Sequence, residues 1–222
     1  MSMNSKLINI YRNIKNEMIS VGWGQYFNDL KVTTNDKYTE HEFIEHYIWV
    51  VLSSGLRYKV VQKIYPKVMY VINGMINGKI TFSRLCEVDD KLFIEQVLKV
   101  FGNRRKVVGI KRAAVIVEDF YGNYENFINC YDKDGRKILE ELPYLGPRTS
   151  YHMEIGLNKD VAKPDRHLER VALYFSYNDV QEFCIYIKGI TGDNLRIVDA
   201  VWWSFFEQFG SKNINILLSE YN

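Results

Sequence analysis

Two short segments of the chain combine residue types that could bind a phosphate and act on the sugar beside it. The first is Leu142-Pro-Tyr-Leu-Gly-Pro-Arg-Thr-Ser150, and the second is Lys163-Pro-Asp-Arg-His167. In the first, the apolar Leu142 and Leu145 and the flexible Gly146 favour a tight turn between two short helices. Backbone N–H groups at the start of the helix after such a turn attract a phosphate. The segment therefore predicts a helix–hairpin–helix, although an ordinary corner between two helices has the same features.

The second segment brings one carboxylate, Asp165, close to this turn in the sequence. A carboxylate beside a sugar can stabilise the positive charge that develops when the bond to a base breaks, and it can align or deprotonate the attacking water. Asp165 is equally suited to cap a helix that begins at Arg166, and both roles can hold together. We expect His167 to pack or to form hydrogen bonds rather than to act as a base.

Composition and charge set wide bounds on the function. The 222 residues, 47% of them hydrophobic and 25% charged, can bury a core as one domain or as two lobes. The net charge of +2 is too small to indicate a nucleic-acid partner by itself. Residues 46–86 and 96–117, however, contain no acid, so their basic residues can form a positive face or simply a solvated one. These residues include Arg57, Lys59, Lys63 and Lys67 in the first run, and Arg104, Arg105, Lys106, Lys111 and Arg112 in the second.

Three cysteines, Cys86, Cys130 and Cys184, lie far apart and form no CxxC motif. Their spacing argues against a zinc site, an iron–sulfur cluster and a secreted disulfide framework. No apolar stretch is long enough to span a bilayer, and the N-terminal segment is amphipathic rather than a signal peptide. We therefore expect a cytoplasmic protein with no membrane partner.

Hydrophobic periodicity predicts a mostly helical chain. The expected helices cover residues 7–18, 43–51, 57–71, 89–101, 104–120, 134–141, 149–157, 165–174, 179–188 and 193–209. Thr39, Asp165, Asp179 and Asp193 are the expected N-caps. The one expected exception is a short strand pair over residues 69–80, where two Asn-Gly dipeptides suggest turns.

The order of these parts resembles a known family of DNA-repair enzymes. A basic segment at residues 101–110, a long helix, the hairpin and residues 161–168 follow one another as in the helix–hairpin–helix (HhH-GPD) DNA glycosylase superfamily. This superfamily includes endonuclease III, the 8-oxoguanine glycosylases and the alkyl-purine glycosylases. The residues that carry the resemblance are Leu142, Pro143, Gly146, Thr149, Asp165 and His167. It covers roughly residues 101–170 and is loose elsewhere.

The resemblance implies a mostly α, two-lobed helical fold with a central cleft, built as one globular unit of residues 1–222. A core lobe of about residues 100–175 would hold the hairpin and the catalytic aspartate, and the N-terminal part and C-terminal helices would form the second lobe. The implied activity is base-excision repair, in which the enzyme flips a damaged or modified base out of double-stranded DNA and hydrolyses its N-glycosidic bond. Asp165 stands in the place of the family's essential aspartate.

The resemblance also assigns contacts with DNA. The expected phosphate contacts are Leu142, Tyr144, Gly146, Arg148, Thr149, Arg104, Arg105 and Lys106. A loop after an early core helix, which in the family inserts a residue into the gap left by the flipped base, here comprises Ser54, Gly55, Leu56 and Arg57. Gly55 stands where Gln or Asn is usual, so Leu56 or Arg57 is the expected plug. Trp23, Tyr26 and Tyr151 are the expected base-pocket residues, although most aromatic residues of the chain suit the core equally well.

Several positions depart from the family pattern. Bifunctional members carry a lysine where this chain has Arg148, and a guanidinium cannot form the Schiff base that an amine can. The resemblance therefore implies a monofunctional glycosylase without lyase activity, with Lys163 as the alternative nucleophile. Tyr144 replaces a frequent glycine. The iron–sulfur cluster of endonuclease III is not expected, whereas a structural monovalent cation at the hairpin fits the family. The expected partner is a lesion-containing duplex bound by a monomer, which would be nucleoid-associated when bound.

The main alternative is a protein that binds DNA through the hairpin without catalysis, or a nuclease subunit of that kind. A carboxylate that faces DNA repels phosphate, so binding alone gives no reason for Asp165. A metal-dependent nuclease is disfavoured because no acidic cluster with ligand spacing surrounds the hairpin.

Overall fold

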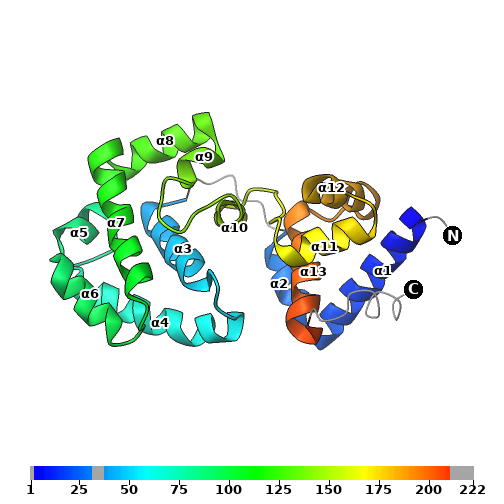
Figure 1. Cartoon of the computed structure of the whole chain (residues 1–222), viewed down its shortest axis with the longest axis horizontal. Coiled ribbons are helices and arrows are strands. Elements are labelled where there is room, and N and C mark those ends of the chain that lie inside the picture. The colour runs from blue at the N-terminus through cyan, green and yellow to red at the C-terminus, as the bar shows by residue number, and fades with distance from the viewer. Residues whose placement is uncertain (1–2, 32–37, 211–222) are drawn as a thin grey trace. The chain divides into compact units, whose positions relative to one another are not determined.

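The computed structural model describes residues 3–31 and 38–210, and within these ranges it contains helices and no strand (Figure 1). This confirms the mostly α class. The chain divides into two compact units: unit 1 comprises residues 1–35 and 158–222, and unit 2 comprises residues 36–157. The hairpin therefore belongs to unit 2 and Asp165 to unit 1, whereas the sequence predicted one lobe for both.

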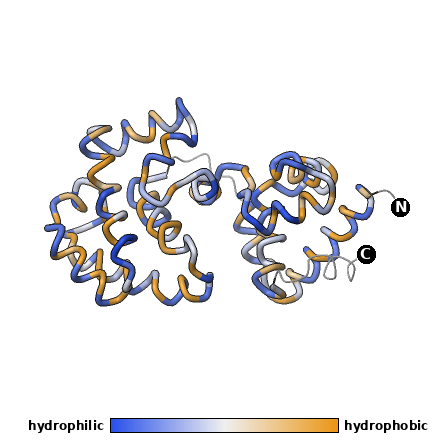
Figure 2. The backbone as a smooth tube through the Cα atoms, viewed as in Figure 1, coloured by the Kyte–Doolittle hydropathy of each residue, from blue (hydrophilic) through white to orange (hydrophobic). Residues whose placement is uncertain are grey.

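Unit 1 joins the first helices of the chain to the last. Its elements are α1 (Met3–Met18), a turn over Ile19–Trp23, α2 (Gly24–Asp29), α11 (Arg166–Tyr174), α12 (Val180–Thr191) and α13 (Leu195–Phe209). In Figure 2 hydrophobic and hydrophilic stretches alternate along α1, as expected of a helix with one buried face. The chain turns between α1 and α2 at Gly22, whose φ of +104° favours glycine.

The core of unit 1 is organised around α13, which is buried along most of its length. Trp202 and Phe205 are fully buried, and α1, α11 and α12 pack against this helix. Burial of one such aromatic side chain contributes about 2 to 3 kcal/mol. The packing of α11 against α13 explains why residues 158–174 belong to unit 1 rather than to the lobe that contains the hairpin.

Unit 2 contains the remaining helices. They are α3 (Glu40–Ser53), α4 (Tyr58–Met75), α5 (Phe82–Glu87), α6 (Asp90–Leu98), α7 (Arg104–Tyr121), α8 (Tyr124–Asp134), α9 (Arg136–Leu139) and α10 (Thr149–Gly156). The helix α7 packs against α3, α5, α6 and α8, and it ends at Gly122, which adopts the left-handed conformation. None of the helices over residues 3–31 and 38–210 has the length and apolar content that crossing a bilayer requires.

The predicted strand pair over residues 69–80 is wrong. The helix α4 continues through Asn73-Gly74 and ends at Met75. Val68, Met69 and Ile72 are all buried, and their spacing of three and four residues suits one face of a helix packed on the core. Burial of this face outweighs the turn propensity of the Asn-Gly dipeptide.

Most predicted caps are confirmed. Thr39 forms a capping box with Glu42, and Asp165 and Asp179 each accept hydrogen bonds from first-turn N–H groups of the helices that follow. Asp193 is the exception, because α13 begins later, at Leu195. Both oxygens of Asp193 lie 2.6 Å from Nζ of Lys15, and Oδ2 accepts the hydroxyl of Tyr11 at 2.8 Å. This aspartate ties α1 to the start of α13 instead of capping a helix.

Candidate functional site

The hairpin is seated in unit 2 by two leucines. Leu142 and Leu145 are 1% and 2% exposed and belong to the core that α3, α4 and α7 also build. The hydroxyl of Tyr47, which is buried on α3, donates to the carbonyl of Pro143 at 2.8 Å. Apolar contacts and one buried hydrogen bond therefore hold the turn against the core of unit 2.

The sharp bend of the hairpin falls on Tyr144 rather than on Gly146. Tyr144 has φ of +69°, a left-handed conformation that is costly for a residue with a side chain. Its ring lies over Gly109 of α7, where an added Cβ would lie 2.7 Å from a ring carbon. Gly109 thus provides the space for the ring of Tyr144.

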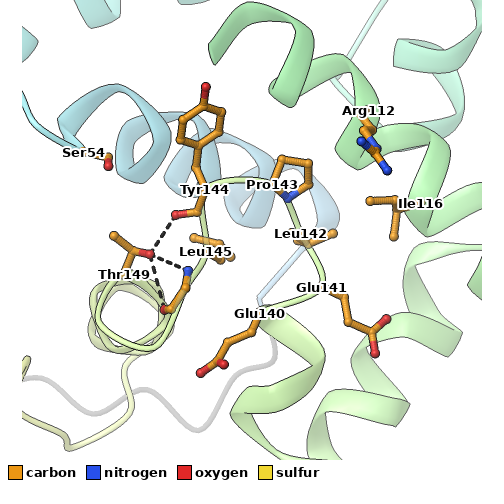
Figure 3. Close-up of a pocket in the computed structure, with 11 residues that line it drawn as sticks. Ser54, Arg112, Ile116, Glu140, Glu141, Leu142, Pro143, Tyr144, Leu145 and Thr149 are labelled. Atoms are coloured by element: carbon orange, nitrogen blue, oxygen red, sulfur yellow. Dashed lines mark hydrogen bonds between the residues drawn. The ribbon is translucent and has the colours of Figure 1, made fainter. Parts of the chain in front are cut away.

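Gly146 precedes the second hairpin helix α10, which begins at Thr149, and it serves the turn in a different way. Its N–H donates to the hydroxyl of Thr149 at 2.7 Å, and that hydroxyl donates to the carbonyl of Tyr144 at 2.7 Å (Figure 3). Gly146 is not left-handed, and a Cβ added to it would meet nothing within 4 Å. No atom of unit 2 occupies the space that a side chain at this position would take, so a ligand can approach the backbone of Gly146 closely.

Two arginines of α7 flank the place where the hairpin packs. Gly109 lies under Tyr144, with Arg105 one helical turn before it and Arg112 one turn after it, and both arginines are exposed. Arg112 lines a shallow depression of about 620 Å³ together with the hairpin and Ser54 (Figure 3). Arg104 is also exposed. The basic run of the sequence thus supplies exposed cations beside the hairpin.

Lys106 of the same run has a different position from the one expected. It is 5% exposed, and its ammonium group donates to the carbonyls of Leu52 at 2.9 Å and Ser54 at 2.5 Å, at the C-terminal end of α3. Burial lowers its pKa to about 8. Lys106 therefore caps α3 and is not available to a phosphate. The expected inserting loop begins at this anchor, and beyond it Gly55, Leu56 and Arg57 are exposed.

Two carboxylates make the depression beside the hairpin mixed in charge. Glu140 accepts the hydroxyl of the buried Ser150 at 3.1 Å, and Glu141 accepts the hydroxyl of Tyr121 at 2.5 Å. Both extend away from the ring of Tyr144 in Figure 3. The depression itself is therefore a poor phosphate pocket, and the start of α10 is the better candidate for an anion.

The structure gives no support to a cation at the hairpin. The carbonyl oxygens of Leu142, Pro143, Tyr144 and Gly146 already accept hydrogen bonds from Leu145, Tyr47, Thr149 and Ser150. The monovalent cation therefore stays a prediction, and no step proposed below uses one.

Asp165 in unit 1 is partly exposed and begins α11. Its Oδ1 accepts the N–H groups of His167 at 2.8 Å and Leu168 at 3.0 Å. The His167 ring stacks on Phe206 of α13 at a centroid distance of 5.1 Å, as expected of a packing residue. The second carboxylate oxygen, Oδ2, has no hydrogen bond of this kind to the start of α11, so the cap leaves it for other chemistry.

Side chains from α12 and α13 hold the backbone of the loop before Asp165. The side-chain amide of Gln181 both accepts from the N–H of Ala162 and donates to its carbonyl. Asp199 accepts the N–H of Lys163 at 2.9 Å. Asp160 pairs with Lys188 at 2.5 Å. We refer to residues 158–165 as the Asp165 loop. Its hydrogen bonds fix the position of the catalytic candidate more firmly than a cap alone would.

Three aromatic rings gather in unit 1 and include two of the expected base-pocket residues. Trp23, Tyr26 and Trp203 form edge contacts at centroid distances of 5.4 to 6.4 Å, and Tyr26 is 41% exposed. Trp203 lies four residues after Asp199 on α13, so both project from the same side of that helix. The aromatic cluster therefore adjoins the side of α13 that contacts the Asp165 loop.

The third expected pocket residue, Tyr151, is not part of this cluster. It belongs to unit 2, where the guanidinium of Arg136 lies 3.4 Å from the centre of its ring. The same guanidinium pairs with Glu154 at 3.2 Å. Tyr151 is therefore engaged in a contact between α9 and α10.

Sequence reasoning missed Asp199 as a site residue. It is 8% exposed, and burial together with the charge of Asp165 raises its pKa to about 7. The sequence carries only a weak signal for it, namely a single acid in an otherwise apolar helix at Ile197-Val-Asp-Ala-Val201. Such an acid is costly to bury unless it has a partner.

Comparisons with protein-family models, with curated proteins and with solved structures found no match for this chain.

Proposed function

We propose that the protein is a base-excision-repair DNA glycosylase that hydrolyses the N-glycosidic bond of a damaged or modified base. The proposal assigns the grip on the DNA backbone to the hairpin surface of unit 2 and bond cleavage to unit 1. The observation that carries it is the Asp165 loop. Here the carboxylate that caps α11 follows a loop whose backbone is bound by side chains of α12 and α13, and α13 also bears an aromatic ring, Trp203, one turn after Asp199.

In the proposed reaction, the bond between the base and C1′ of the sugar breaks, and its electron pair leaves with the base nitrogen, which takes up a proton. The carboxylate of Asp165 stabilises the positive charge on the sugar. The oxygen of one water then bonds to C1′, and Asp165 accepts a proton from that water. The products are the free base and an abasic site, and Trp23, Tyr26 and Trp203 would stack on the extruded base.

The hairpin surface supports the DNA-binding half of the proposal. The N–H groups at the start of α10 and the exposed Arg105 and Arg112 offer contacts to phosphates, and Gly146 allows close approach of the backbone. The exposed Leu56 or Arg57 would enter the gap left by the base. The division into one unit from the middle of the chain and one from its two ends is compatible with the two-lobed HhH-GPD fold that the proposal implies.

A non-catalytic DNA-binding protein is the second candidate, and one observation favours it. The cap on α11 accounts by itself for one oxygen of Asp165. Capping of α11, however, does not explain why Gln181 and Asp199 also bind the backbone of Ala162 and Lys163. A bifunctional enzyme is a variant of the first candidate, with Lys163 as the nucleophile in place of the absent hairpin lysine.

The direct test is a screen of the purified protein against duplexes that contain uracil, 8-oxoguanine, an alkylated purine or hypoxanthine. Release of one of these bases, with abasic sites in equal amount, would support the glycosylase. Tight duplex binding without release of any base would favour the second candidate.

A further inference from the structure

Asp199 is connected to Asp165 through the backbone of one intervening residue. Oδ2 of Asp199 accepts the N–H of Lys163 at 2.9 Å, and the carbonyl of Lys163 accepts the N–H of Asp165 at 2.8 Å. Asp199 lies on α13, 34 positions further along the chain. A movement of its side chain would therefore be passed to the catalytic candidate across two hydrogen bonds.

The surroundings of Asp199 are apolar, with few charged groups near it. The groups that act on its charge are Asp165 and Lys163 from the loop, and it acts in turn on the Cys184 thiol of α12. On α1, Tyr11 and Lys15 are bound by Asp193. Among the described residues, the negative charge of Asp165 opposes ionisation of Asp199, so the two carboxylates form an electrostatic pair.

We propose that Asp199 is a positioning residue for Asp165, which holds the loop through Lys163 and strengthens the negative potential at Asp165 when it is ionised. The inference rests on the proposed function, because Asp165 is the catalytic carboxylate of that proposal. Asp199 itself touches neither the sugar nor the base in this scheme.

The proposal has opposite consequences for activity and for stability. Burial and Asp165 raise the pKa of Asp199 from 3.8 to about 7, so base release accelerates as the pH rises through 7 and Asp199 ionises. The folded state retains a proton that the unfolded chain releases above its lower pKa. The contribution of Asp199 to the free energy of unfolding is therefore present below about pH 4 and is lost as the pH rises through 7.

Two substitutions separate the hydrogen bond from the charge. Asp199→Asn keeps an oxygen that can accept the N–H of Lys163, so base release persists but loses its inflection near pH 7. Asp199→Ala removes both roles, and we expect kcat to fall about 10- to 100-fold at every pH with little change in KM. Asp193→Asn is the matched control, because Asp193 is equally buried in unit 1 but contacts α1. It should retain the wild-type pH profile.

A measurement without DNA distinguishes failure of this inference from failure of the proposed function. The carboxyl carbon of Asp199, followed by NMR, should titrate near pH 7 in the wild type and at a lower pH in Asp165→Asn. Coupled titration in a protein that releases no base would support the link between the two carboxylates and reject the glycosylase. Base release with a normal profile in Asp199→Asn and undiminished kcat in Asp199→Ala would overturn the positioning role and leave the glycosylase in place.

Discussion

The hairpin of unit 2 and the Asp165 loop of unit 1 are held by opposite means. The hairpin of unit 2 is seated by buried leucines, a glycine notch and hydrogen bonds between neutral groups. The Asp165 loop of unit 1 is held largely by ionisable and amide side chains, among them Asp160, Gln181 and Asp199. A loop held by apolar contacts keeps its position over a wide range of pH, whereas one held by carboxylates responds to protonation. For the proposed glycosylase, the comparison predicts DNA binding that is insensitive to pH and base release that depends on pH.

The largest effect is expected from a change in unit 1 alone. Asp165→Asn keeps the cap on α11, because asparagine caps as well as aspartate, but it removes the charge. Base release should fall at least about 100-fold, while duplex binding stays the same or tightens because a repulsive charge is lost. Single-turnover release and fluorescence anisotropy with the same duplex measure the two quantities. Release at the wild-type rate would refute the mechanism.

The complementary change disturbs the hairpin and leaves unit 1 intact. Gly109→Ala places a methyl group where the ring of Tyr144 lies, and this overpacking should cost about 1 to 3 kcal/mol in the free energy of unfolding. Tyr144→Gly removes the ring and the left-handed strain, so the double variant should recover most of the loss. Urea unfolding of the four proteins of this cycle measures the coupling. Additive effects would mean that the ring and the notch do not interact.

A smaller effect is expected from the exposed cations of α7. Arg105→Gln with Arg112→Gln should weaken duplex binding about 10-fold at moderate salt and reduce the salt slope by up to about 2, without a change in lesion preference. The sequence had suggested Lys106 as part of this set, but its burial makes Lys106→Gln a test of folding. A salt titration that is identical for the double variant and the wild type would show that the phosphates bind elsewhere.

The smallest expected effect concerns covalent trapping on DNA, where we expect no adduct. In the proposed glycosylase Arg148 stands in for the lysine of bifunctional enzymes and cannot form an imine, so borohydride should trap no covalent adduct between the unmodified protein and damaged DNA. Strand cleavage should then require added alkali. Efficient trapping would instead assign a nucleophile, and its loss in Lys163→Ala would identify Lys163 within the Asp165 loop.

Local features of the chain were readable from the sequence, because they depend on neighbours within one or two helical turns. The long helices, the capping box at Thr39 and the cap at Asp165 are of this kind. The helix α8 was not predicted, since only Phe127 and Tyr131 are buried in it, and most of its other residues are polar. Asn73-Gly74 led to the wrong prediction of a turn. The local turn propensity of this dipeptide is strong, but burial of the apolar face of α4 keeps the segment helical.

The parts of the site that escaped prediction depend on contacts between distant segments. The charge of Lys106 and its basic neighbours suggested a phosphate contact. The structure instead places its ammonium group on the carbonyls at the C-terminal end of α3, which it caps. Asp199 belongs to no motif, and its relevance follows from the hydrogen bond between α13 and the Asp165 loop. Sequence patterns suggested chemistry for the hairpin and the Asp165 loop, whereas the fold shows which contacts hold each of them in place.

The lysine cap on α3 has a counterpart further along α7. The ammonium of Lys111 donates to carbonyls at the end of α5, those of Leu85, Cys86 and Val88, just as Lys106 serves the end of α3. One helix thus closes the last turns of two others. In native-state hydrogen exchange, the amides in the C-terminal turns of α3 and α5 should lose protection together with those of α7, as one cooperative opening unit. Such an opening would release the start of the 54–57 loop, so the local stability of α7 would set how long that loop stays in place.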